Sequence, residues 1–519
     1  MRQRFAAGAR IPVPGRARLA PSAVLLPALA LALALALALA IGGCAPLPRP
    51  AAPPRPPVVA VAKPELEPQD LRDIPQDVTG LLAQSAATAN LDAPLLTPQA
   101  QAGFLERFRA AHFAPWGQTN ATLGPASALW GLDKLKSNGH FGENLRPLGP
   151  GFKAEMEALC QAWAYPSLVR PAIATANTSL RVLPTIRPGF LKPTRPGEGF
   201  PFDYWQNSGV WAGTPLVVTH LSADGAWALV EARNAGGWVR VADIAYVDEA
   251  FMFRWASLPL LAVTREHTPV STQASVQNSG QNAAQKTGPG GTFLFHGRIG
   301  AVLPLLSEDE SGYTALAPAR GAGGLAETVS VRIAKDAAAA MPLSPTPRNL
   351  GRLADQMLGQ PYGWGGYLDN RDCSALMLDL LAPLGIFLPR NSSQQAKSGE
   401  YASFEGLTGP QKEALVLARG VPLLTLLYKR GHIMLYLGQM GGGQYQGRAI
   451  MLHDIWGLKT LDESKVEGRV VIGRTVVTTL EPGRELPDVA RAGTLLETMA
   501  GMTLLAPGGN PPATSDRTR

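Results

Sequence analysis

The stretch that decides the fold is Pro361-Tyr-Gly-Trp-Gly-Gly-Tyr-Leu-Asp-Asn-Arg-Asp-Cys-Ser-Ala-Leu-Met-Leu-Asp-Leu-Leu381. A Gly-rich turn leads into Asp-Cys-Ser, and leucines then recur at helical spacing. Asn370 and Asp372 are candidate N-cap residues for this helix. The pattern predicts a buried helix with Cys373 in its first turn, where free backbone N–H groups and the helix dipole favour a thiolate.

Two downstream histidines supply the other parts that a nucleophilic cysteine needs, a general base and a group that orients it. Gly431-His-Ile-Met-Leu-Tyr-Leu-Gly438 predicts a strand that opens on His432. Arg448-Ala-Ile-Met-Leu-His-Asp-Ile-Trp-Gly457 predicts the next strand, which carries His453. Antiparallel pairing brings both histidines to one end of a sheet. Asp454 is the alternative orienting group, although it alternates to the other strand face.

Five motifs in this order resemble the motif series of the NlpC/P60 cysteine peptidases. They are Pro361-Tyr-Gly-Trp-Gly-Gly366, Arg371-Asp-Cys-Ser374, Leu388-Pro-Arg-Asn-Ser-Ser-Gln-Gln395, the His432 strand and His453-Asp-Ile-Trp-Gly-Leu458. The series covers the region from about 345 to about 485. The chain most resembles the bacterial lipoprotein members that carry two SH3-like modules before the catalytic domain. The bland alternative is that Cys373 is an inert core thiol, because free cysteines are among the most buried residues.

The resemblance implies a papain-like catalytic domain with Cys373 as nucleophile, His432 as base and His453 as orienting group. An acyl-transfer site also needs oxyanion donors. The Cys373 N–H is one, and the resemblance implies the Tyr362 hydroxyl as the other. A packed aromatic beside the Gly turn is the alternative for Tyr362. The sequence has Ala375 where the family usually has Gly, a small-for-small change.

Relatives of this architecture cleave the γ-D-glutamyl bond to a diamino acid in murein stem peptides that begin with a free L-Ala. The resemblance implies that Asp372 holds the free amine. Ser374, Arg390 and Ser392 would hold the D-Glu carboxylate, and Trp364 would line the same subsite. Carboxylate with ammonium, and guanidinium with carboxylate, are the matching charges. Helix capping and solvated turns are the alternatives for these polar residues.

The first 43 residues have the pattern of an export signal. Arginines come first, an apolar run follows from Val24 to Ile41, and Gly-Gly-Cys44 ends it. Cys44 is the predicted lipid attachment site, and Ala45 after it indicates outer-membrane rather than inner-membrane sorting. An uncleaved membrane anchor is the alternative, since the run is near the span threshold of about 18 residues. Both alternatives place the rest of the chain in the cell envelope, facing the periplasm.

The basic net charge comes from this signal. Five of the 47 Lys and Arg lie in the first 43 residues, which have no acids; 42 remain against 40 Asp and Glu. No basic stripe interleaved with aromatics is present, so nucleic acid is not an expected partner.

The expected fold is a multi-domain α+β protein with a helical and irregular N-terminal region, two small SH3-like β-barrels and a papain-like catalytic domain. The expected segments are a signal peptide (1–43), a Pro-rich linker (44–68), an N-terminal clip or stabilising region (69–200), a first barrel (201–256), a second barrel (257–342) with a mobile insert at about 271–290, the catalytic domain (343–483) and a tail (484–519).

The remaining chemistry is sparse. Cys160 shares a helical face with Phe152 and Met156 and is expected to be a core residue. No His, Cys or carboxylate cluster has metal-ligand spacing, and no cofactor is expected. The predicted protein is a monomer that hydrolyses peptidoglycan stem peptides. Two alternatives stay open: a non-catalytic cell-wall-binding lipoprotein, and an acyltransferase on the same papain-like fold.

Overall fold

The computed structural model describes residues 67–85, 88, 90–136, 139–272 and 291–505. The expected signal peptide, Cys44, nearly all of the Pro-rich linker, most of the 271–290 insert and the last residues of the expected tail lie outside this part. The chain divides into two units, Met1–Pro64 and Glu65–Arg519, and the description below concerns the second. None of the described helices has the length and apolar character needed to cross a bilayer.

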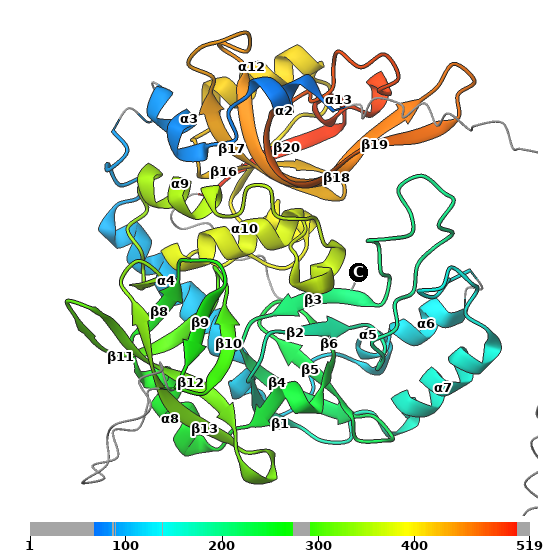
Figure 1. Ribbon diagram of the computed structural model, residues 1–519, viewed down its shortest axis with the longest axis vertical. Coiled ribbons are helices and arrows are strands. Elements are labelled where there is room, and N and C mark those ends of the chain that lie inside the picture. Colours follow the sequence, from blue (N-terminus) through cyan, green and yellow to red (C-terminus); the bar gives the residue numbers. More distant parts are fainter. Residues whose placement is uncertain (1–66, 86–87, 89, 137–138, 273–290, 506–519) are drawn as a thin grey trace, which may run out of the picture. The chain divides into compact units, whose positions relative to one another are not determined.

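The described chain begins with helices α2 to α7, continues with strands β1 to β14, which α8 interrupts, and ends with a mixed segment from α9 to β20 (Figure 1). The α-helices are α2 (Gln69–Asp73), α3 (Val78–Gln84), α4 (Pro98–Phe113), α5 (Pro125–Ala128), α6 (Gly131–Lys136), α7 (Pro150–Cys160), α8 (Glu249–Ser257), α9 (Pro347–Asp355), α10 (Cys373–Leu381), α11 (Ser392–Gln395), α12 (Gly409–Arg419) and α13 (Leu495–Thr498). The strands are β1 (Arg170–Ala174), β2 (Thr178–Arg181), β3 (Gln206–Val210), β4 (Pro215–Leu221), β5 (Trp227–Ala232), β6 (Gly236–Arg240), β7 (Ile244–Tyr246), β8 (Leu260–Val263), β9 (Thr268–Ser271), β10 (Phe293–Gly297), β11 (Val302–Asp309), β12 (Gly312–Arg320), β13 (Ala326–Ala334), β14 (Ala338–Ala340), β15 (Glu400–Ser403), β16 (Thr425–Lys429), β17 (His432–Gln439), β18 (Ala449–Leu461), β19 (Glu467–Thr479) and β20 (Met499–Leu504).

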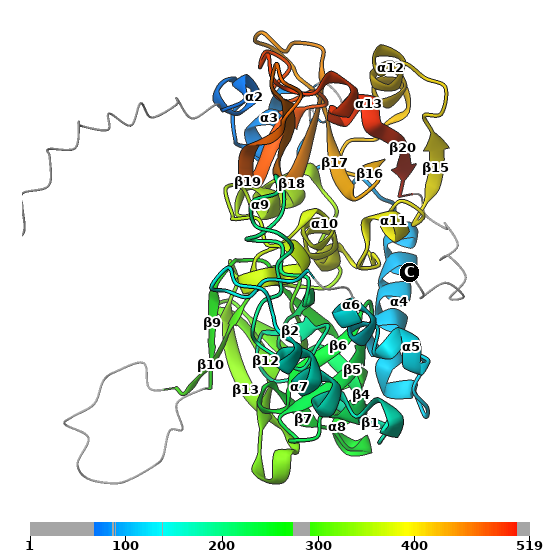
Figure 2. The ribbon, with the colours of Figure 1, turned by 90° about the vertical axis from the view of Figure 1, so that its right-hand side faces the viewer.

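The C-terminal domain is built on a six-stranded antiparallel sheet in the order β15-β20-β16-β17-β18-β19. Helix α10 packs on one face, where Leu376 and Leu380 join Leu435 and Leu452 in one apolar cluster. Helices α12 and α13 cover the other face, which carries a second apolar cluster (Figure 2). Because both faces are buried, β17 and β18 are apolar along most of their length rather than alternating.

The first barrel is a seven-stranded antiparallel sheet in the order β3-β2-β6-β5-β4-β1-β7. Helix α7 packs against it through Phe152, Met156 and Cys160, which cluster with Trp205 and Trp238. Trp238 is fully buried in this cluster beneath α7, whereas Val239, on the other face of β6, belongs to a separate apolar cluster with Val218 and Val230. The Gly-rich turn of the C-terminal domain contacts strand β3.

The second barrel has a five-stranded sheet in the order β13-β12-β11-β8-β14 and a separate β9-β10 ribbon. Helix α4 bridges two domains, since Phe104 belongs to the core around α10 whereas Phe108 packs with Leu260 and Val302 of this barrel. Helices α3 and α9 also pack against each other, so the N-terminal region is part of the C-terminal domain's core.

Two expectations about segments differ from the structure. Strands β1 and β2 lie within 69–200, where helical and irregular structure was expected, because their hydrogen-bond partners β3, β4, β6 and β7 all come later in the chain. The expected tail also contains β20, which pairs with both β15 and β16. Within β20, a Cβ at Gly501 would come within 2.4 Å of the Tyr401 side chain, so packing requires glycine there.

Candidate active site

Cys373 is the first residue of α10, as the sequence predicts. The Asp372 side chain caps the helix by accepting a hydrogen bond from the Ala375 N–H at 2.9 Å, which confirms one of the two N-cap candidates. The Ile433 N–H, one residue after His432, hydrogen-bonds to the Cys373 sulfur. Packing of α10 on β17 therefore brings the thiol to the start of the strand that carries His432.

The two predicted histidines are in direct contact. His432 Nε2 lies 3.0 Å from His453 Nδ1, and His453 Nε2 lies 3.0 Å from the Thr478 hydroxyl. That hydroxyl donates its proton to the Thr479 carbonyl, so it accepts from His453. We accordingly assign the Nε2–H tautomer to both rings, which leaves His432 Nδ1 as the nitrogen with a free lone pair.

Burial favours the neutral forms of the Cys373 thiol and the His432 imidazole. Burial, and then the Asp372 carboxylate, raise the pKa of Cys373 to about 12. Burial, and then Lys429, lower the pKa of His432 to about 3. The expected thiolate at the helix start is therefore wrong for the resting protein. Among the described residues, no hydrogen bond joins the Cys373 sulfur to an imidazole nitrogen.

Asp454 does not replace His453 beside His432. It lies on the α10 side of the sheet, paired in register with Thr475, whereas His453 shares the opposite face with Met451 and Ile455. The carboxyl is fully buried, and burial raises its pKa well above the usual range. His453 is thus the residue placed to orient His432.

Asp372 and Arg390 form a buried ion pair beside the nucleophile. Two guanidinium N–H groups of Arg390 donate to the two Asp372 oxygens at 3.1 and 2.7 Å. Burial alone would raise the pKa of Asp372, but Arg390 holds it below its usual value. The Ser374 hydroxyl bonds both partners, at 2.9 Å to Asp372 and 2.8 Å to Arg390. The predicted binding residues Asp372, Ser374 and Arg390 therefore come together.

The first barrel takes part in this network. Arg390 Nε donates to the Ser208 hydroxyl on β3 at 2.9 Å. Strand β3 also packs on the Gly-rich turn, where a Cβ at Gly366 would lie 2.4 Å from the Gly209 nitrogen. Gly366 has φ 88° as well, so both its backbone conformation and the close approach require glycine.

Aromatic rings gather around the predicted oxyanion donor. Tyr362 lies 6.1 Å, between ring centroids, from both Phe202 and Trp456. Trp364 is half-buried against Tyr204, at 4.9 Å between centroids. Burial, and then neighbouring Cys373, raise the pKa of Tyr362 well above its usual value, so its hydroxyl stays protonated. Ser392 begins α11, and within the described residues no side-chain hydrogen bond links it to Arg390.

Three polar residues in this site escaped the sequence analysis. Thr478 orients His453, Ser208 holds Arg390, and Gln395 donates to the carbonyls of Ser374 and Pro389 at 2.8 and 2.9 Å. Gln395 is the last residue of the motif Leu388–Gln395, so the sequence could have indicated a role for it. Thr478 and Ser208 lie in no motif. No group of three or more His, Cys, Asp or Glu side chains in the described residues is arranged to hold a metal ion.

Comparison with known protein families matches three segments of the chain. Residues 32–165 match the NLPC_P60 stabilising domain (N term), residues 188–240 match an SH3 domain of the SH3b1 type, and residues 359–478 match the NlpC/P60 family. No curated protein matches the chain.

One solved structure has a similar fold. An NlpC/P60 endopeptidase from Photobacterium damselae subsp. piscicida is 24% identical, with a TM-score of 0.72 over 83% of this chain and 97% of that one. An NlpC/P60 family protein from Bacillus cereus ATCC 10987 is 17% identical, with a TM-score of 0.38 over 64% of this chain and 98% of that one. The chain thus carries an NlpC/P60 family domain, preceded by the NlpC/P60 stabilising domain and an SH3 domain of the SH3b1 type.

Proposed function

We propose that the chain is a cell-wall peptide hydrolase that cleaves the bond between γ-D-Glu and the diamino acid of murein stem peptides, with the Cys373 thiol as nucleophile. The observation that carries the proposal is the placement of Cys373 at the start of α10, one hydrogen bond from the strand that holds the His432–His453–Thr478 chain. Family membership of the domain supports a peptidase acting on peptidoglycan.

Proton transfer inside the site is the first step of the proposed reaction. His432 Nδ1 takes the thiol proton, and the thiolate attacks the γ-carbonyl carbon of the glutamyl residue. The resulting oxyanion accepts hydrogen bonds from the Cys373 N–H and the Tyr362 hydroxyl. The imidazolium then gives its proton to the leaving amine of the diamino acid, and a thioester remains. Water, deprotonated by His432, hydrolyses that thioester and restores the thiol.

Burial raises the free energy of either charge alone, but proton transfer creates both charges together. A thiolate and an imidazolium in contact attract each other most strongly in a site without water. His453 accepts the His432 Nε2–H throughout, so it stabilises the imidazolium and fixes the ring's orientation. A peptide that seals the site would therefore favour the ion pair that the resting protein lacks.

Substrate recognition follows from the Asp372–Arg390 pair. The N-terminal part of such a stem peptide, L-Ala-γ-D-Glu, offers an ammonium and an α-carboxylate. Binding would exchange the internal pair, 2.7 Å apart, for an Asp372–ammonium pair and an Arg390–carboxylate pair. Ser374 contacts both internal partners and would stay with the carboxylate, together with Ser392. Trp364 would cover the same subsite.

The deciding experiment is product analysis with defined peptides. The purified chain is incubated with murein tri- and tetrapeptides that have either a free or an acetylated L-Ala amine, and products are identified by mass spectrometry. We expect L-Ala-γ-D-Glu and a free diamino-acid fragment, formed much faster from the free amine. Binding without any product would instead indicate a non-catalytic cell-wall-binding protein. An amide with an added amine acceptor would indicate an acyltransferase.

The proposal places the enzyme in the envelope as a monomeric lipoprotein anchored through Cys44, with outer-membrane sorting. It is supported by the signal-like first 43 residues. Labelling cells with a fatty-acid analogue tests it. Lipid should attach to the wild-type chain and be absent from Cys44→Ala; equal labelling of both would exclude Cys44 as the site.

A further inference from the structure

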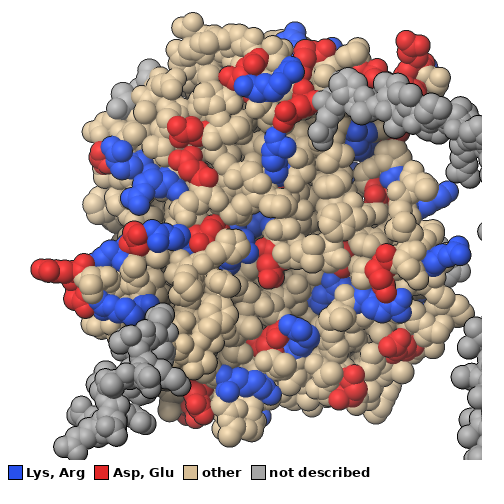
Figure 3. All heavy atoms as spheres, viewed as in Figure 1, with Lys and Arg blue, Asp and Glu red and all other residues tan. Residues whose placement is uncertain are grey.

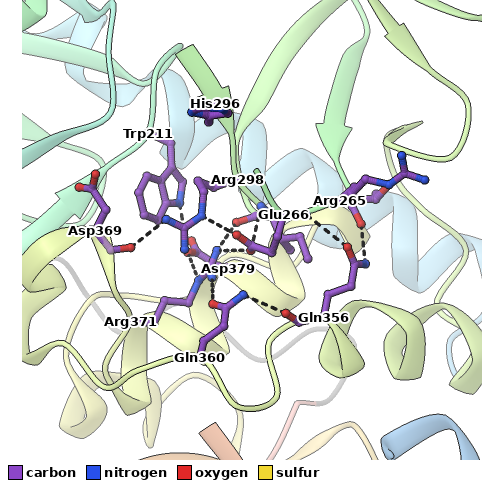
Figure 4. Close-up of polar contacts among 12 residues, drawn as sticks. Trp211, Arg265, Glu266, His296, Arg298, Gln356, Gln360, Asp369, Arg371 and Asp379 are labelled. Atoms are coloured by element: carbon purple, nitrogen blue, oxygen red, sulfur yellow. Dashed lines mark hydrogen bonds and ion pairs between the residues drawn. The ribbon is translucent and has the colours of Figure 1, made fainter. Parts of the chain in front are cut away.

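Arg371, two residues before Cys373, uses its whole guanidinium group in buried contacts (Figure 4). Nε donates to Asp379 on α10 at 2.8 Å, and Nη1 donates to the Gln360 side chain at 2.9 Å. Nη2 reaches the second barrel, where it meets Glu266 at 2.8 Å and the Ile299 carbonyl at 2.9 Å. Arg371 is 2% exposed, so water satisfies none of these groups.

Glu266 links Arg371 to a second guanidinium. One carboxylate oxygen pairs with Arg371, and the other accepts from Arg298 Nε at 2.5 Å. Arg298 also donates to the Asp369 carbonyl at 2.9 Å, in the turn that precedes the nucleophile. The Gln356 side chain, on the C-terminal domain, accepts from the Glu266 N–H at 3.2 Å and so contacts the loop between β8 and β9 that carries Glu266. The second barrel thus contacts the backbone and side chains of the segment leading to Cys373.

The cluster contains two cationic and two anionic side chains, and their contacts define one arrangement of these four residues. Arg371 and Arg298 oppose Glu266 and Asp379, and Trp211 of the first barrel lies over both guanidiniums at 5.1 and 5.6 Å. Burial alone would raise the pKa of Glu266, but Arg371 and Arg298 hold it below its usual value. Buried ion networks of this kind add little net stability but define one arrangement, since any displaced charge loses its partner.

Consecutive residues before the nucleophile are therefore held by different barrels. Arg371 is held by Glu266 of the second barrel, and Asp372 is held by Arg390, which bonds Ser208 of the first. Glu266 and Arg298 lie outside the three segments that match known families and outside the motif series. We propose that Glu266 and Arg298 are positioning residues that set the first turn of α10, and hence the Cys373 sulfur, for reaction.

This inference rests on the proposed function, in which Cys373 is the nucleophile. The test is Glu266→Gln, which keeps the shape of the side chain and removes its charge. We expect kcat on the stem peptide to fall about 10- to 100-fold with little change in KM, because a small displacement of a reacting group has effects of that size. Glu266→Asp is the second variant; it keeps the cluster neutral, so the fold is retained, but withdraws the carboxylate from Arg371.

One control variant separates a positioning role of Glu266 from a purely stabilising one. Glu413→Gln removes a partly buried ion pair with Arg448, 2.8 Å long, in the same domain but remote from Cys373. It should lower the melting temperature and leave kcat unchanged. If Glu266 only stabilises the fold, both Glu266 variants should behave like Glu413→Gln, with a lower melting temperature and a kcat per folded molecule at the wild-type value. That result would overturn the inference.

A readout without substrate keeps this test separate from the proposed function. Iodoacetamide is reacted with the folded protein, and the peptide that contains Cys373 is quantified by mass spectrometry. A changed rate constant in Glu266→Gln and Glu266→Asp, in either direction, supports positioning, and an unchanged one opposes it. If wild type reacts with iodoacetamide but cleaves no stem peptide, the proposed function fails while the effect on Cys373 is still measured.

Discussion

Cys160 and Cys373 are both free, buried and at a helix end, and both lie near a histidine, yet their surroundings differ. Burial raises the pKa of each thiol to about 12. Cys160 ends α7, where the dipole opposes a thiolate, and His220 bonds its carbonyl rather than its sulfur, at 2.9 Å. Cys373 begins α10 and has the Ile433 N–H on its sulfur. Burial therefore does not distinguish Cys160 from Cys373, whereas helix polarity and the groups that face the sulfur do.

The largest difference between the two thiols should appear on substitution. Cys373→Ala should lower kcat on the stem peptide by about 10⁴-fold or more, as expected when the nucleophile of a catalytic set is removed. Cys160→Ala should keep kcat and lower the free energy of unfolding by about 1–2 kcal/mol through the cavity it leaves. Peptide turnover and urea unfolding measure the pair. If Cys373→Ala cleaved the stem peptide at the wild-type rate, the proposed nucleophilic role of Cys373 would be wrong, and the two thiols would not differ in function.

The histidines beside each cysteine provide the next contrast. His432→Ala removes the proposed base and should lower kcat by about 10³-fold or more. His220→Ala removes a ring packed between Tyr165 and Trp238, and should reduce stability by about 1–3 kcal/mol without changing kcat per folded molecule. Circular dichroism melts and steady-state kinetics on both variants separate the two effects. A loss of kcat in His220→Ala equal to that of His432→Ala would show that fold integrity explains both.

A smaller effect is expected at the end of the histidine chain. Thr478→Val deletes the acceptor of the His453 Nε2–H and leaves a buried donor unpaired, which should lower kcat about tenfold and cost about 1–3 kcal/mol in stability. Thr478→Ser keeps the hydroxyl and serves as the matched control. The two variants should differ in kcat; equal values would mean that His453 is oriented without Thr478.

The sequence was most informative where chemistry follows from local position. The N-cap at Asp372, Cys373 in the first turn and His432 at the start of a strand all depend on neighbours a few residues away, and each is where the pattern predicts it. The motif order likewise indicates the α+β domain organisation that the family models and the fold show.

The parts that escaped prediction depend on long-range contacts. Ser208 and Arg390 are 182 residues apart, and only the tertiary fold makes them partners. Strand β2 and the strand β20 have hydrogen-bond partners far along the chain, which a local pattern cannot supply. The pKa of Cys373 was misjudged for a related reason, since the helix dipole is a local term whereas burial depends on everything packed around the sulfur.

Surface charge gives no comparable contrast, because the face in Figure 3 shows acidic and basic side chains interspersed rather than gathered into one patch. The buried groups decide the pH behaviour instead. The predictions about binding and catalysis concern contacts between buried side chains. Salt screens such contacts only weakly.

The smallest expected difference between the variants and the wild type is in how the free energy of unfolding depends on pH. Near neutral pH this difference disappears. Each thiol has a folded-state pKa raised from 9.0 to about 12, so its contribution is complete below pH 9 and is lost as pH rises toward 12. Cys160→Ala and Cys373→Ala should both flatten this alkaline loss of stability.

His432 affects stability on the acid side. Its folded-state pKa is lowered from 6.5 to about 3, so its contribution to stability is complete above pH 6.5 and is lost as pH falls toward 3. His432→Gln should flatten that acid loss, and neither cysteine variant should. Urea unfolding from pH 4 to pH 10 measures both limbs; an acid limb unchanged in His432→Gln would mean that this imidazole is not held neutral by burial, and that the resting site beside Cys373 is already charged.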